Sequence, residues 1–362
     1  MNRRNFLKIL AFLTFFLSFN LFSKTKRIVR FKHGVASGDP TPDDVILWTK
    51  VTSNSKGSIL VFYEVSNTID FKNIIASGKQ YTTVGRDFTV KVDARIPNKF
   101  AGQKVFYRFA AEGVYSQIGT TFTLPEDVEN FKLAVFSCSN YPAGYFNAYN
   151  SASKDKSIDM AIHLGDYLYE YKQGEYATEN SISLNRQPIP NKEIITLSDY
   201  RQRHAQYKSD MDLQKLHSTM PVLCAWDDHE ITNDAWKNNA ENHQLNEGSF
   251  SQRKRNAIKA YYEWMPVREP KISFNNWKRY KIGKLIDLKL LETRISSRSK
   301  QVNLNDYIKD GKNFQKEAFL KELNNKKRSL IGKKQLDFIK ENDLDDQTWN
   351  LYAQQVLSLI HI

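Results

Sequence analysis

The chain of 362 residues contains only two cysteines, Cys138 and Cys224. Neither belongs to a C-x-x-C pair or to a Cys/His zinc spacing, so a disulfide scaffold is excluded and at most one bridge can form. The sequence also lacks internal repeats and low-complexity tracts. Its longest apolar run near the N-terminus, Ile9 to Phe22, is too short for a comfortable transmembrane helix.

The composition is that of an ordinary globular protein, with 41% hydrophobic and 26% charged residues. These fractions exclude a disordered chain, a collagen-like fibre and a polytopic membrane protein. The length predicts two domains or one large one, with enough core to fold without a disulfide or metal. An excess of 53 basic over 40 acidic residues gives a net charge of +13. This charge suggests an anionic partner such as nucleic acid, a lipid head group or a phosphate ester, but charge alone favours a solvated basic surface.

Residues 1–26 have the organisation of an export signal, with Arg3 and Arg4 before the apolar run and Lys24 after it. The paired arginines and the following Phe-Leu-Lys favour a twin-arginine signal over a general secretory one, and hence the twin-arginine export machinery as a partner. We therefore expect a periplasmic or secreted protein. No clean A-x-A site follows the run, so an uncleaved anchor stays open; without one, no stable membrane partner is expected.

The rest of the chain shows two different patterns of apolar and polar residues. Residues 31–124 hold short alternating runs at 45–48, 59–65, 88–92 and 104–109, which predict a small all-β sandwich of immunoglobulin or fibronectin type. Residues 124–127 form a linker. From residue 131 to 362, strands predicted at 132–136, 158–164 and 221–225 alternate with helices at 144–156, 200–216 and 251–265, which is the pattern of α/β layers. The acidic turn at 38–44 is attributed to turn chemistry rather than to a metal site.

The ends of the three predicted α/β strands carry unusual polar residues, and ligands gather at the carboxyl ends of such strands. Cys138 follows the first strand and Gly165-Asp166 the second. The third is followed by Asp227-Asp228-His229-Glu230. Taken singly, Cys138 fits a small buried hydrophobe and Asp166 a helix N-cap. Three acids and a histidine in a half-buried place repel one another, however, and are best explained by bound polyvalent cations.

Together these motifs resemble the PhoD-type alkaline phosphatase/phosphodiesterase family of the metallophosphoesterase superfamily. The resemblance covers nearly everything after the signal. The matching stretches are FKHGVASGDPTPDDVILWT at 31–49, FSC ending at 138, GDYLYEY from 165, WDDHEITND at 226–234 and YEWMPVR at 262–268. It implies an αββα metallophosphoesterase-like layered sandwich at 131–362, preceded by the small β domain.

The resemblance also implies a metal centre. Cys138, Asp166 and Tyr169 would hold Fe³⁺, and Asp166 would bridge to Ca²⁺, or another divalent metal, held partly by Asp228. Asp227 and Asn233 are the neighbouring candidate ligands, and His229 would face the phosphoryl group. The chemistry agrees, because carboxylates favour Ca²⁺, Mg²⁺ or Mn²⁺, whereas a phenolate with a thiolate suits a ferric ion.

The implied activity is hydrolysis of phosphate mono- and diesters by a metal-activated hydroxide, for phosphate scavenging. A secreted nuclease, for which nucleic acid is the substrate, and a phospholipase-D-like phosphodiesterase differ only in the leaving group. A non-catalytic truncated fragment or phosphate-ester binder is the alternative from another class.

Two departures from the family pattern bear on these alternatives. Glu292 stands in Leu291-Glu292-Thr293-Arg294 where the family usually has aspartate, which should keep a charge but move it. The family carries further ligands after the strand that begins near Trp349, so a chain ending at Ile362 is expected to hold an incomplete catalytic domain.

Overall fold

The computed structural model describes residues 28–54, 57–270, 275–341 and 347–356. The predicted export signal at 1–26 lies outside the described residues. Within the described ranges, no helix has the length and apolar character needed to cross a membrane.

The N-terminal region is entirely β and consists mainly of two antiparallel sheets around a shared hydrophobic core. Alternation builds it: in β8, Val105, Tyr107 and Phe109 face the core, while the residues between them are partly exposed. One sheet joins β2 (Val35–Gly38), β3 (Asp44–Lys50) and β7 (Thr89–Arg95), and the other joins β10 (Gly119–Thr121), β8 (Val105–Ala111), β5 (Ile59–Ser66) and β6 (Ile74–Thr82), with β9 (Val114–Tyr115) beside β8. A short pair, β1 (Val29–Arg30) and β4 (Thr52–Ser53), flanks them. The four strands predicted here are confirmed.

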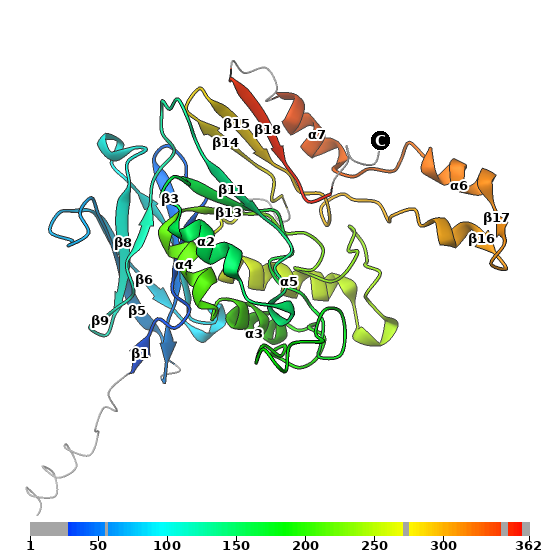
Figure 1. The fold of residues 1–362 in the computed structure, drawn as a ribbon, viewed down its shortest axis with the longest axis horizontal. Helices are drawn as coiled ribbons and strands as arrows, with labels where there is room; N and C mark the ends of the chain where they lie inside the picture. Colours follow the sequence, from blue (N-terminus) through cyan, green and yellow to red (C-terminus); the bar gives the residue numbers. More distant parts are fainter. Residues whose placement is uncertain (1–27, 55–56, 271–274, 342–346, 357–362) are drawn as a thin grey trace, which may run out of the picture.

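The second region is built on a parallel sheet of β11 (Leu133–Phe136), β12 (Met160–His163) and β13 (Val222–Cys224). Helices α2 (Asn147–Lys154), α3 (Leu197–Tyr207), α4 (Met211–Thr219) and α5 (Phe250–Trp264) lie with it (Figure 1). A second sheet of β14 (Lys278–Ile282), β15 (Ile286–Leu290) and β18 (Trp349–Ala353) follows. In β12, Ala161 belongs to the core shared with the helices, whereas Met160 and Ile162 belong to the core shared with the second sheet. The parallel sheet therefore has apolar layers on both faces, as its continuous hydrophobic strands require.

The helix predicted at 200–216 is wrong in one respect, because the segment forms two helices. The Asp210 carboxylate accepts hydrogen bonds from the backbone N–H groups of Asp212 (2.9 Å) and Leu213 (3.1 Å). This N-cap starts α4 in a new direction after α3 has ended at Tyr207. The apolar spacing continues through the break, and for this reason periodicity alone joined the two helices.

Asp39, in the acidic turn after β2, connects the two regions. Its buried carboxylate accepts hydrogen bonds from the Tyr280 hydroxyl (2.6 Å) and the Arg268 backbone N–H (2.6 Å), and it pairs with Lys278. Only the later part of this segment shows the predicted turn chemistry, because the Asp44 N–H donates to the Thr41 hydroxyl at 2.9 Å. Asp39 is thus an anchor between regions.

The segment between β15 and β18 extends away from the rest of the structure (Figure 1). It comprises β16 (Ile308–Lys309), β17 (Asn313–Phe314) and α6 (Lys316–Leu323), and the chain then returns through α7 (Gly332–Glu341) to β18. Within this arm, the Phe319 ring contacts both Tyr307 and Phe314. Helix α7 reaches the site loops described below through Gln335.

Candidate metal centre

The predicted site residues meet at the carboxyl edge of the parallel sheet. The loop after β11 carries Cys138, the loop after β12 carries Asp166, and the loop after β13 carries Asp228 and His229. The first two loops are joined directly, because the Cys138 N–H donates to the Gly165 carbonyl at 3.1 Å. Parallel strands bring their ends to one edge, so residues far apart in sequence become neighbours.

The backbone at this edge adopts a conformation that L-residues rarely use. Cys138 and Asp166 have φ angles of 56° and 52°, and Gly165 has 119°. A Cβ atom at Gly165 would overlap the backbone nitrogen and side chain of Asp227. Glycine is therefore required for the β12 loop to approach the β13 loop this closely. Such strain at a strand end is typical of functional sites.

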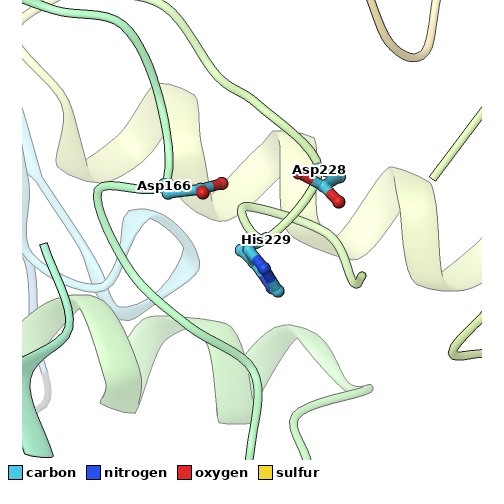
Figure 2. A group of neighbouring side chains, drawn as sticks. All are labelled: Asp166, Asp228 and His229. Atoms are coloured by element: carbon cyan, nitrogen blue, oxygen red, sulfur yellow. The ribbon is translucent and has the colours of Figure 1, made fainter. Parts of the chain in front are cut away.

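The Asp166 carboxylate is the centre of the cluster. Its Oδ2 accepts hydrogen bonds from the Cys138 thiol at 3.4 Å and the Tyr169 hydroxyl at 3.3 Å. Its Oδ1 is buried and has no hydrogen-bond partner among the described residues. Ligand atoms of Asp166, Asp228 and His229 all lie within 4.8 Å of one another, and Figure 2 shows the three side chains on their neighbouring loops. Burial and the charge of Asp228 raise the pKa of Asp166, as expected for carboxylates gathered without a cation.

His229 is held by Glu170, a residue that the sequence analysis did not assign to the site. The His229 Nδ1 and the Glu170 Oε2 are 2.7 Å apart, and Glu170 is fully buried. Burial alone would lower the pKa of His229, but the hydrogen bond and charge of Glu170 outweigh it and raise the pKa to about 10. The contact directs Nδ1 to Glu170 and leaves Nε2 for another partner. Glu170 was visible in the GDYLYEY motif, but its partner lies 59 residues further along the chain.

Glu230 braces the loops. Its carboxylate accepts hydrogen bonds from three backbone N–H groups, those of Asp166 (3.1 Å), Tyr167 (2.6 Å) and Asp227 (2.7 Å). Burial raises its pKa. Glu230, predicted to be one of the acids that a cation neutralises, instead fixes the β12 loop against the β13 loop.

Asp227 and Asp228 face an arginine. Arg294 pairs with Asp227, and its Nη2 lies 3.2 Å from Asp228 Oδ1. The other Asp228 oxygen, Oδ2, accepts from the Asp234 N–H at 2.5 Å. The Asn233 amide donates to Glu241 at 3.0 Å. Asp227 thus pairs with Arg294 and Asn233 with Glu241, and the role of both residues as metal ligands stays a prediction.

Glu292 organises the loop that presents Arg294. The carboxylate is buried and accepts hydrogen bonds from the backbone N–H groups of Arg294 (2.8 Å), Ile295 (2.7 Å) and Ser296 (2.9 Å). It also accepts from the Trp226 indole N–H at 3.0 Å. The Glu292 charge therefore lies against the backbone of this loop, and its displacement relative to an aspartate stays a prediction.

The donor atoms of this cluster fit a mixed metal centre. A thiol, a phenol and a carboxylate meet at Asp166 Oδ2, and Oδ1 of the same carboxylate has no hydrogen-bond partner among the described residues. Ligand atoms of Asp228 and His229 lie within 4.8 Å of this carboxylate. Thiolate and phenolate favour a ferric ion, and carboxylates favour a hard divalent cation. The orphaned oxygen supplies the ligand that a second cation needs.

Comparisons with known proteins agree with this geometry. Residues 133–361 match the family described as PhoD-like phosphatase, and residues 18–125 match the PhoD-like phosphatase N-terminal domain. Alkaline phosphatase D of Bacillus subtilis (strain 168) is 35% identical over 344 residues, which cover 90% of this chain and 56% of that protein. A solved structure of PhoD superposes with a TM-score of 0.77 at 33% identity, covering 90% of this chain and 62% of the other. The chain thus spans little more than half the length of its curated relative.

Proposed function

The chain belongs to the PhoD-like phosphatase family, and we propose on this premise that it is a metal-dependent hydrolase of phosphate mono- and diesters. The observation that supports this most directly is the buried Asp166 carboxylate. One of its oxygens accepts from a thiol and a phenol, the other has no hydrogen-bond partner among the described residues, and ligand atoms of Asp228 and His229 lie within 4.8 Å. A carboxylate in this setting is costly unless a cation binds to it.

In this proposal Cys138, Asp166 and Tyr169 hold Fe³⁺, and Asp166 and Asp228 hold Ca²⁺ or another divalent ion. When bound, the metals supply a hydroxide at moderate pH and neutralise phosphate oxygens. The described residues provide the rest of the positioning. The short link between the β11 and β12 loops and the brace from Glu230 hold the ligands together before any metal binds.

His229 supplies a proton donor at the site. Glu170 accepts a hydrogen bond from His229 Nδ1. It also accepts hydrogen bonds from the Thr232 hydroxyl (3.1 Å), the Asn233 N–H (2.7 Å) and the Asn242 amide (3.0 Å). This buried network fixes the ring, so that a protonated Nε2 is available to donate to a phosphoryl oxygen as charge develops on it.

The proposal is tested on the purified chain by elemental analysis and by hydrolysis of nitrophenyl phosphate mono- and diesters. We expect iron and calcium in the wild type. Asp166→Asn should lose bound metal and reduce turnover by about 100-fold or more, because a bridging ligand is removed. Asp70→Asn, on an exposed loop of the N-terminal region, is the matched control. Full turnover by Asp166→Asn would refute the assignment, whereas metal binding without any hydrolysis by the wild type would favour the phosphate-ester binder.

The fold and the destination of the chain are part of the same proposal. An αββα layered sandwich is supported by the apolar layers on both faces of the parallel sheet, and the immunoglobulin-like type of the N-terminal region by its two-sheet core. Export to the periplasm or the exterior through the twin-arginine machinery, for phosphate scavenging, is supported by residues 1–26. Changing Arg3 and Arg4 to lysine should stop export; continued export would exclude this route.

A further inference from the structure

Arg294 contacts Asp228, the carboxylate that the proposed function assigns to a divalent cation. We propose that Arg294 is a built-in counter-cation of the site, which competes with a divalent metal ion for Asp228. The inference rests on the metal site of the proposed function.

The contacts of Asp228 carry the inference. Arg294 Nη2 lies 3.2 Å from Oδ1, and the Asp234 N–H occupies Oδ2. The same guanidinium pairs with Asp227, and its Nη1 lies 3.5 Å from Asp234 Oδ1. Both oxygens of Asp228 are therefore engaged, whereas Asp166, which is only 6% exposed, keeps one oxygen without a partner among the described residues. Of the two carboxylates in the triad, one is ready for a cation and the other is already neutralised.

The charge of Arg294 opposes a metal ion at this place. Two cations that share one carboxylate lie a few ångströms apart, and their repulsion is large where water is scarce. The Arg294 side chain is only 11% exposed, so salt screens it weakly. A cation that binds Asp228 must therefore displace the guanidinium or tolerate it.

The loop around Arg294 resists displacement. Glu292 holds the backbone N–H groups of residues 294–296. Gln335 of α7 then holds Glu292 from both sides, because its amide oxygen accepts the Glu292 N–H at 2.8 Å and its amide nitrogen donates to the Glu292 carbonyl at 2.7 Å. Gln335 is fully buried. The arginine is thus held as a fixed positive charge at the site.

An orienting role and a competing role of Arg294 predict opposite changes in metal affinity when the residue is removed. If Arg294 only orients Asp228 as a ligand, its removal weakens metal binding. If it competes, its removal strengthens binding while the metal-free protein becomes less stable, because the acids then repel one another without a cation.

The experiment is a calorimetric titration of the full metal-stripped chain with Ca²⁺ alone. We expect Arg294→Gln to bind Ca²⁺ about tenfold or more tightly than the wild type, since a nearby positive charge is removed. Arg255→Gln is the control: it removes the same charge from an exposed position of α5, where the guanidinium donates a hydrogen bond to Gln252 at 2.8 Å. Its affinity should stay within about twofold of the wild type.

Weaker or unchanged binding by Arg294→Gln would overturn the inference and leave the proposed function standing. Absence of Ca²⁺ binding in the wild type and both variants would overturn the metal site itself. Should Arg294→Gln fail to fold, Arg294→Lys decides, because a lysine cannot span both aspartates as the planar guanidinium does. Tighter binding by the lysine variant supports competition, and weaker binding contradicts it.

Discussion

Asp39 and Asp166 are both buried aspartates at the end of a strand, yet their surroundings differ completely. Asp39 receives a lysine, a tyrosine hydroxyl and a backbone N–H, all from the second region of the chain. These partners outweigh its burial and lower its pKa. Asp166 has a thiol and a phenol on one oxygen and, within the described part of the chain, no hydrogen-bond partner on the other, and its pKa is raised. A buried acid whose partners are complete holds the fold, whereas one whose partners are incomplete is kept for a ligand.

The largest effect on stability is expected from replacing Asp39, the aspartate whose hydrogen-bonding partners are all present. Asp39→Ala leaves Lys278, whose side chain is half-buried, without its carboxylate partner and removes the link between the regions. The free energy of unfolding should fall by about 3–5 kcal/mol, the usual effect of removing one member of a buried pair. Urea unfolding measures it, with Asp43→Ala, whose partner Arg95 is exposed, as the control. A loss as small as that of the control would show that Asp39 is not an anchor.

Metal removal should destabilise only those proteins that keep Asp166, the aspartate whose partners are incomplete. With metal present at about 100 times its dissociation constant, binding stabilises the folded wild type by about 2.7 kcal/mol. Chelation should therefore lower the thermal unfolding midpoint of the wild type and of Asp39→Ala by similar amounts, but leave that of Asp166→Asn unchanged. An equal shift in Asp166→Asn would mean that the stabilising metal binds elsewhere.

The Glu170–His229 pair lies beside Asp166, but its own hydrogen bond is formed. Glu170→Gln keeps the shape and removes the charge that holds the imidazolium. We expect kcat to fall about 10–100-fold with little change in KM, as for a lost partner of a site residue. Steady-state kinetics measure the two constants separately, and Glu175→Gln, whose partner Lys172 is exposed, is the control. An equal fall of kcat in the control, or a change confined to KM, would argue against the positioning role.

The smallest effect concerns pH and the interface between the regions. His204 stacks on Trp264, and neither ring nitrogen has a partner among the described residues. Burial, assisted by the charge of Lys208, lowers its pKa from 6.5 to about 3. Between these values the unfolded chain binds the proton and the folded chain does not, so stability is full above pH 6.5 and falls as the pH decreases.

His204→Leu should flatten this decline, as measured by unfolding at pH 7 and pH 5. Gln202→Leu on the exposed face of the same helix should keep the wild-type slope. An unchanged slope in His204→Leu would assign the acid sensitivity to other groups.

The sequence predicted what depends on local pattern. Alternation located β3, β5, β7 and β8, and the strand-end motifs brought Cys138, Asp166, Tyr169, Asp228 and His229 to the right edge. It missed β6, an edge strand with few buried residues. It also missed the partners of Asp39, because the chain separates Asp39 from Arg268 by 229 residues. The roles of Glu170, Glu230 and Glu292 depend on similar distant contacts, and no spacing rule reveals these.

The two hydrogen bonds between Gln335 and Glu292 make the site depend on a part of the chain that is synthesised late. Glu292 leaves the ribosome 43 residues before the glutamine that secures its backbone. The aspartates of the β13 loop emerge earlier still. A chain synthesised only as far as residue 334 therefore carries Arg294 on a loop that lacks both Gln335 hydrogen bonds.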